Sequence, residues 1–133
     1  AAVEACKAAG HRVALATNPI FPAVATESRI RWAGLAPETF AWYTTYENIG
    51  YCKPNPDYYR EILRYLGCRA EDCLMVGNDV EEDMMAAQAA GLSVFLLTDC
   101  LLNRKEKDIS SYPQGDFDAL LAFVEEWGGE ASL

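Results

Sequence analysis

The chain has 133 residues, of which 51% are hydrophobic and 23% are charged, and its formal net charge is −9. This composition excludes a disordered chain and fits one domain of ordinary size with a real core. The acidic excess argues against a nucleic-acid groove or a surface for anionic membranes, since both need basic patches. The negative charge fits a protein that binds a cation. A simple contribution to solubility explains most of this charge equally well.

Helices and strands are predicted to alternate along the chain in the order α β α β α β α β α. The nine segments are expected at residues 1–9, 12–17, 23–33, 39–47, 56–66, 73–77, 82–90, 93–98 and 117–127. A glycine follows each of the first four helices, which is typical of helix ends, and residues 101–115 are expected to form a polar loop. Short, continuous apolar strands separated by helices predict a Rossmann-like parallel α/β sheet with helices on both faces. No internal repeat or linker divides residues 1–133.

The cysteines give no sign of a disulfide framework or a zinc site. There are five of them, an odd number, and no two form a C-x-x-C pair. Free thiols in a reducing compartment are therefore expected. The sequence shows no signal peptide and no apolar run of membrane-spanning length, so the predicted location is cytoplasmic.

In open parallel sheets, ligands bind beyond the carboxyl ends of the strands, so the residues that follow each strand are the candidates for a site. Thr17 and Asn18 follow the first predicted strand. A hydroxyl and backbone N–H groups at such a junction can hold phosphate oxygens. Taken alone, Thr-Asn-Pro favours a simple turn and helix cap.

Lys53 precedes Pro54 and a predicted helix. The proline denies helical geometry to the lysine before it, which holds the ammonium in place, where it can neutralise a phosphate or a carboxylate. The alternative is a solvated lysine, the usual state of this residue.

Four carboxylates crowd the end of the third predicted strand, in the stretch MVGNDVEEDMMAAQAAG. Mg²⁺ takes oxygen ligands, and one or two carboxylates at a strand end suit it. The alternative is the helix dipole, which favours acidic residues at a helix start. The helix dipole accounts for acidic residues at positions 81 and 82, Glu81 and Glu82. It accounts less completely for Asp83, and it does not account for Asp79 directly at the strand end.

Each signal is weak alone, but their order along the chain is specific. With ALATN, KPNPDYY and MVGNDVEEDMMAAQAAG as its second, third and fourth motifs, the chain resembles the haloacid dehalogenase (HAD) superfamily of phosphohydrolases. The resemblance implies a HAD-like core and an Mg²⁺-dependent phosphatase acting on a small phosphorylated molecule.

The resemblance also implies roles for individual residues. Thr17 would bind the phosphoryl group, Asn18 would support the turn, and Lys53 would stabilise the charge on the nucleophile and phosphate. The metal ligands would come from Asp79, Asp83 and Asn78. Asp79 is the preferred ligand because a carboxylate binds Mg²⁺ better than an amide does. Asn78 stands where the family usually has an aspartate. Asp83 is either a ligand, a group that supports the ligands, or a helix-start residue. Glu82 is expected to face solvent.

The largest departure from the family pattern concerns its first motif, a strand that ends in Asp-x-Asp and supplies the nucleophile and the general acid-base. The only Asp-x-Asp here, at Asp116 and Asp118, is predicted to start a helix. In the family, the missing strand lies between the strands predicted here as first and third. We therefore expect residues 1–133 to be a partial core without first motif or cap, inactive alone, with the strand supplied by a missing amino-terminal segment or by a partner chain.

Two other readings remain open. One is a non-catalytic α/β binding or assembly module that a partner chain completes. The other, a receiver domain or nucleotide-binding fold, is weaker, because no lysine closely follows residues 93–98 and there is no Walker or G-x-G-x-x-G loop. The loop with Asn103, Arg104 and Lys105 either approaches the site or is simply solvated.

Overall fold

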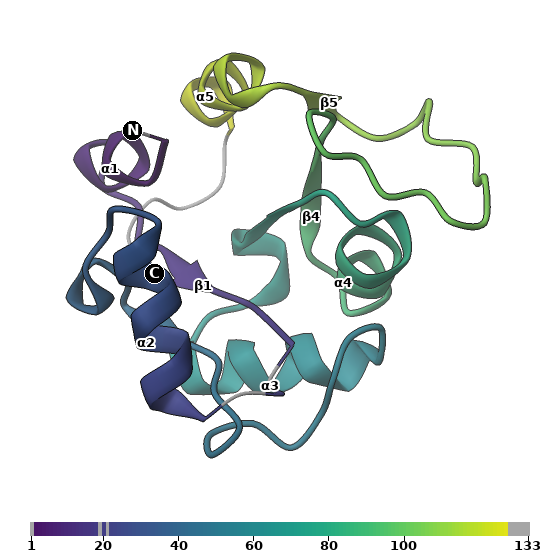
Figure 1. Cartoon of the computed structure of the whole chain (residues 1–133). Coiled ribbons are helices and arrows are strands. Elements are labelled where there is room, and N and C mark those ends of the chain that lie inside the picture. The colour runs from purple at the N-terminus through teal and green to yellow at the C-terminus, as the bar shows by residue number, and fades with distance from the viewer. Residues whose placement is uncertain (1, 19, 21, 128–133) are drawn as a thin grey trace.

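The computed structural model of the chain describes residues 2–18, 20 and 22–127 (Figure 1). The helices are α1 (Ala2–Ala8), α2 (Ala23–Trp32), α3 (Pro56–Leu66), α4 (Ala86–Ala89) and α5 (Phe117–Glu126). The strands are β1 (Ala14–Leu15), β2 (Trp42–Tyr43), β3 (Leu74–Gly77), β4 (Ser93–Leu97) and β5 (Gln114–Gly115). A π-helical segment, η3 (Val80–Met85), precedes α4 directly, and short 3₁₀ turns occupy Pro37–Thr39 and Ala70–Asp72.

The strands form two parallel sheets rather than one. β1 pairs with β2, and β4 lies between β3 and β5. In the part of the chain that the structure describes, no strand ladder joins β1 to β3. The predicted parallel α/β architecture is therefore confirmed, and the sheet is interrupted at the position where the resemblance places the missing strand.

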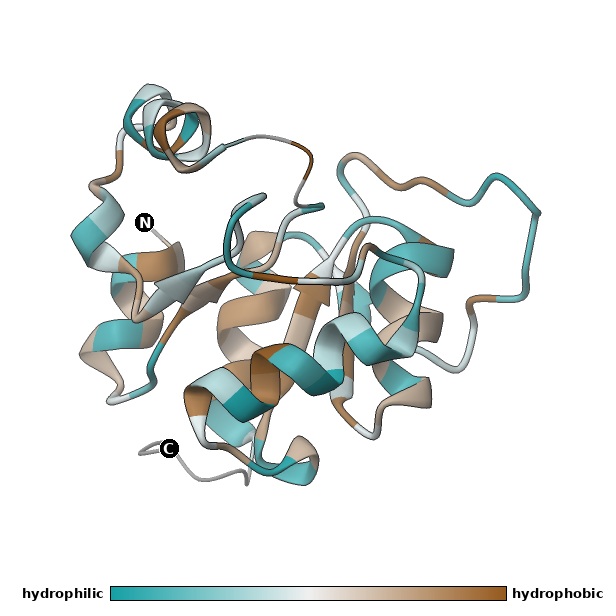
Figure 2. Ribbon diagram, turned by 90° about the horizontal axis from the view of Figure 1, so that it is seen from below, coloured by the Kyte–Doolittle hydropathy of each residue, from teal (hydrophilic) through white to brown (hydrophobic). Residues whose placement is uncertain are grey.

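Helices cover both faces of the larger sheet, as predicted. Side chains alternate between the two faces of a strand, so Val94 and Leu96 of β4 join the main core with Tyr58, Tyr59 and Met84, whereas Phe95 joins a second cluster with Leu120 and Val124 of α5. Figure 1 shows α3 and α4 on one side of the sheets and α1 and α5 on the other. The strands at the centre are coloured as hydrophobic in Figure 2, and the hydrophilic residues lie mainly on the outer helices and loops.

Several predicted boundaries differ from the structure. β1 and β2 are much shorter than the predicted strands at 12–17 and 39–47. β5 lies inside the segment predicted as loop; it forms because Leu96 N donates to Pro113 O and Thr98 N donates to Gly115 O. Gln114 and Gly115 have no strand preference of their own, so only the neighbouring β4 explains this strand.

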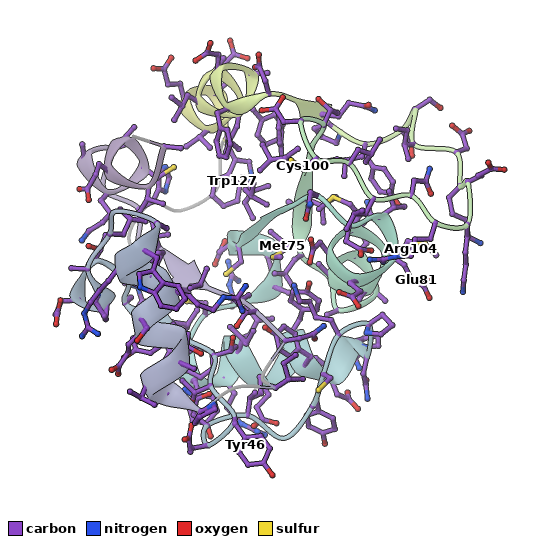
Figure 3. All side chains as sticks on the ribbon, viewed as in Figure 1. Tyr46, Met75, Glu81, Cys100, Arg104 and Trp127 are labelled. Carbon is purple, nitrogen blue, oxygen red and sulfur yellow. The ribbon has the colours of Figure 1, made fainter. Side chains whose placement is uncertain are left out.

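An apolar cavity of about 220 Å³ lies between the two sheets. It is lined by Ala14 of β1 and Ala16 directly after it, by Leu74 and Val76 of β3, and by Ile62 and Leu66 of α3. Met75 and Trp127, two further lining residues, are labelled in Figure 3. Protein interiors rarely leave spaces much larger than a water molecule, so this gap is unusually large for the described part of the chain. Within the described ranges, no helix is both long enough and apolar enough to cross a membrane.

Candidate active site

Thr17 is held at the carboxyl end of β1 by Thr44, which directly follows β2, and by Tyr58 of α3. Its backbone N–H donates to Thr44 Oγ1 over 2.8 Å, and the two threonine hydroxyls are also 2.8 Å apart. The Tyr58 hydroxyl donates to the Thr17 carbonyl oxygen. Thr44 and Tyr58 are both fully buried, so the strand end that carries Thr17 is rigidly placed.

Lys53 is not solvated. Its side chain is only 10% exposed, and Nζ lies 2.7 Å from Asp83 Oδ1. The Lys53 backbone N–H donates to Asn18 Oδ1 over 2.8 Å. The predicted fixed ammonium is therefore present in the structure, and Asn18 joins the turn after β1 to the backbone of Lys53.

Asp83 is buried beneath the end of β3. Its Oδ2 accepts hydrogen bonds from the N–H groups of Asn78 and Asp79, both over 3.1 Å, while Oδ1 faces Lys53. Gly77 makes this approach possible, because a Cβ atom there would lie 2.3 Å from Asp83 Oδ2. Asp83 is therefore more than a helix-start residue.

Both carboxylate oxygens of Asp79 are already engaged. Oδ1 accepts from the N–H groups of Glu81 and Glu82, which caps the η3 segment, and Oδ2 lies 2.6 Å from Arg104 Nη1. Burial alone would raise the pKa of Asp79, but hydrogen bonds from the Glu82 amide and from Arg104 outweigh it and hold the pKa below its ordinary value of 3.8. Backbone N–H groups and an arginine therefore keep Asp79 ionised.

Asn78 and Glu82 complete the turn. Asn78 Nδ2 donates to Cys100 O over 2.8 Å, and its side-chain oxygen accepts no hydrogen bond from the described residues. Glu82 was expected to face solvent, and this expectation is wrong: the residue is half-buried, and its Oε2 lies 3.4 Å from Asn18 Nδ2. The cause is the packing of the turn after β1 against the start of η3, a contact between residues 64 positions apart.

All the predicted site residues thus belong to one region at the carboxyl ends of β1 and β3. Hydrogen bonds link Asn18 to Lys53, Lys53 to Asp83, and Asp83 to the backbone of Asn78 and Asp79. The Asp-x-Asp at Asp116 takes no part in these links; its side chain accepts from Ala119 N and caps α5, as predicted.

Two ion pairs join the loop after β4 to the acidic turn after β3. Arg104 reaches Asp79 from the loop after β4, and Lys105 Nζ lies 3.1 Å from Glu81 Oε1. Figure 3 shows Arg104 and Glu81 close together, and both line the same small surface pocket. The basic run in this loop was the only signal in the sequence, and it could not distinguish a contact from solvation.

The chemistry of the turn suits a hard cation only in part. Asn78, Asp79 and Asp83 offer oxygen atoms, which Mg²⁺ prefers. Arg104 and Lys53 already neutralise the two carboxylates. Among the residues that the structure describes, no group of three or more His, Cys, Asp or Glu side chains is arranged to hold a metal. A bound Mg²⁺ would therefore need waters, substrate oxygens or further protein ligands as well.

Comparison with known proteins finds one protein family that matches this chain. The family described as haloacid dehalogenase-like hydrolase matches residues 1–91. A stretch of 64 residues is 39% identical to glyceraldehyde 3-phosphate phosphatase from Methanothermobacter thermautotrophicus, and it covers 48% of this chain and 28% of that protein.

Solved structures share the fold. A predicted phosphoglycolate phosphatase from Haemophilus somnus superimposes with a TM-score of 0.72 at 24% identity, over 92% of this chain and 53% of that one. The Bacillus subtilis protein YfnB, described as a HAD-hydrolase bound to magnesium, gives a TM-score of 0.71 at 20% identity, over 91% and 53% of the two chains. The chain thus spans about half the length of these two proteins.

Proposed function

The chain belongs to the haloacid dehalogenase-like hydrolases, and on that basis we propose that the natural protein containing it is an Mg²⁺-dependent phosphatase that hydrolyses phosphomonoesters. One observation carries the proposal. Three segments far apart in sequence meet through the bonds of Asn18 to Lys53 and of Lys53 to Asp83. The likeness to glyceraldehyde 3-phosphate phosphatase supports a small phosphorylated substrate.

In this proposal Thr17 and the turn at Asn18 bind the phosphoryl oxygens, and Lys53 offsets the charge on the nucleophile and the phosphate. Fixed positive charge and preorganised donors lower the barrier of phosphoryl transfer because the transition state spreads negative charge over the equatorial oxygens. Lys53 suits this role because its ammonium is buried and already held in place.

Asp79, Asp83 and Asn78 are the proposed Mg²⁺ ligands. The support is the oxygen chemistry of the turn and the magnesium described for YfnB. Asp79 and Asp83 would have to share their carboxylates with Arg104 and Lys53, whereas the side-chain oxygen of Asn78 needs no such exchange. When bound, Mg²⁺ would offset charge on the phosphoryl oxygens.

The nucleophile is proposed to lie on a strand that fits between β1 and β3. The apolar cavity there supports this proposal, because it is lined by both strands and by α3. β1 and β3 run parallel to their own partners and leave their other edges facing this space. Residues 1–133 alone, as a single partial core domain, are then expected to show no turnover.

The test is a phosphatase assay of the full natural protein with and without Mg²⁺, together with Lys53→Ala and Asp79→Ala. Both variants are expected to lose activity. Lys7→Ala and Asp118→Ala, at exposed positions on α1 and α5, are matched controls that should retain it. Full activity in either site variant would refute the assignment.

A second candidate is a non-catalytic module that a partner chain completes, and the same cavity favours it. It predicts a stable complex with a chain that supplies a strand, and no turnover in that complex. Light scattering during size-exclusion chromatography decides: a folded, monodisperse monomer of 14.7 kDa would count against a required partner.

A further inference from the structure

Two adjacent tyrosines near the start of α3 reach the two halves of the site. The Tyr58 hydroxyl donates to the carbonyl oxygen of Thr17, and the Tyr59 hydroxyl donates to the carbonyl oxygen of Glu82 over 2.8 Å. We propose that Tyr58 and Tyr59 are positioning residues that set the distance between the turn after β1 and the acidic turn after β3. This inference rests on the proposed function, because it assigns the two turns to one phosphoryl site.

The two rings are held firmly. Tyr58 is 0% exposed and Tyr59 is 2% exposed, and their rings pack edge to face with centroids 5.0 Å apart. Consecutive side chains on a helix diverge by about 100°. One helix can therefore direct two neighbouring hydroxyls at two different strand ends, which a single side chain cannot do.

The hydroxyls have no packing purpose. A phenylalanine ring would fill the same space, and a buried hydroxyl is unfavourable unless it forms a hydrogen bond. Burial raises the pKa of both phenols well above the ordinary value of 10. Both side chains therefore stay protonated and remain donors at any pH at which the protein would be assayed.

The same stretch of chain also contacts each turn through Lys53. The Lys53 backbone N–H binds Asn18 in the first turn, and its ammonium binds Asp83 in the second. From Lys53 to Tyr59 the chain thus makes two contacts to each turn. Such a short segment, fixed at both ends to both turns, acts as a rigid spacer between them.

The test uses Tyr58→Phe and Tyr59→Phe in the full natural protein, each of which removes one oxygen atom and keeps the ring. Tyr65→Phe is the matched control: it lies on the same helix, is 56% exposed, stacks on Trp42, and its hydroxyl bonds to none of the described residues. The readouts are kcat and KM for a phosphomonoester, and amide hydrogen exchange of residues 17–18 and 79–83.

We expect Tyr58→Phe to speed exchange at 17–18 and Tyr59→Phe to speed exchange at 79–83, each with little effect on the other turn. We expect kcat to fall about 10-fold with KM within about twofold, since small misplacements of catalytic groups reduce rate more than binding. Tyr65→Phe should change neither quantity.

Two results would overturn the proposal. One is exchange in both turns indistinguishable from Tyr65→Phe. The other is a uniform rise in exchange across the protein with kcat per folded molecule unchanged, which is what lost stability alone would give. If the parent protein hydrolyses no phosphomonoester, the proposed function fails, and the exchange pattern still decides whether the tyrosines position the turns.

Discussion

Replacing Gly77 by alanine tests the geometry of the acidic turn directly. The new Cβ would lie 2.3 Å from Asp83 Oδ2, 2.5 Å from its Cγ and 2.6 Å from its Cβ. Contacts under 3.0 Å are essentially never seen for real Cβ atoms, so the Asp83 side chain or the backbone at residue 77 must shift by about 0.7 Å or more. This movement stretches the bonds from the amides of Asn78 and Asp79 and from Lys53, all of which converge on the same group.

The expected cost follows from those three interactions. A hydrogen bond to a charged group contributes about 1.5–3 kcal/mol, and disrupting a buried ion pair costs about 3–5 kcal/mol. Because the carboxylate is displaced rather than removed, we expect Gly77→Ala to lower the free energy of unfolding by about 2–4 kcal/mol. This exceeds the gain of about 0.4–1 kcal/mol that alanine gives by restricting the unfolded chain.

Urea unfolding of the full natural protein measures the change in the free energy of unfolding that Gly77→Ala causes. Gly50→Ala is the matched control. A Cβ at Gly50 would meet only Glu61 Oε2, at an ordinary 3.8 Å, so that variant should stay within about 0.5 kcal/mol of the parent. Equal stability of the two variants would show that Asp83 does not lie against the backbone of Gly77.

Three further predictions concern charge and thiol reactivity. Lys53→Met leaves the buried Asp83 carboxylate with its two amide donors but no ion-pair partner. It should lower the free energy of unfolding by about 3–5 kcal/mol in the same urea assay; a change under about 1 kcal/mol would contradict a buried pair. Arg104→Gln should lower the free energy of unfolding by less than Lys53→Met, because the Arg104 guanidinium is 62% exposed and Asp79 keeps its two amide donors. Since the pKa of Asp79 is held below 3.8, its stabilising effect is present above that pH and lost as the pH falls through the lowered value. Arg104→Gln should therefore lose less stability than the parent between about pH 6 and about pH 3, and an equal loss would argue against the pair. Burial raises the pKa of Cys73 to about 12, so this thiol should resist dithionitrobenzoate at pH 8 in the folded protein while the exposed Cys52 reacts; equal rates would contradict its burial.

That the candidate site residues lie close together could be predicted, because their motifs are local and the topology of parallel sheets is general. Thr17, Lys53 and Asp83 each follow or precede a recognisable element, and parallel strands bring their carboxyl ends to the same edge. The order of the motifs along the chain therefore sufficed to bring these residues together. A gap between β1 and β3 was also predicted, and no strand ladder joins these two strands within the described residues.

The partners of each side chain could not be predicted, because they depend on tertiary packing. Nothing local to Glu82 indicates that Asn18 lies opposite it, and nothing local to Asp79 selects Arg104, which is 25 residues away. The two tyrosines of KPNPDYY look like ordinary core residues until their hydroxyls are traced to Thr17 and Glu82. β5 likewise depends on β4 rather than on its own sequence.

The central claim is that the turns after β1 and β3, together with Lys53, bind one phosphoryl group. The most direct measurement is a crystal structure of the full natural protein with inorganic phosphate and Mg²⁺. The account predicts phosphate oxygens within about 2.7–3.2 Å of Thr17 Oγ1 and Lys53 Nζ, and a strand between β1 and β3. Phosphate bound elsewhere, with Lys53 still paired only to Asp83, would contradict it.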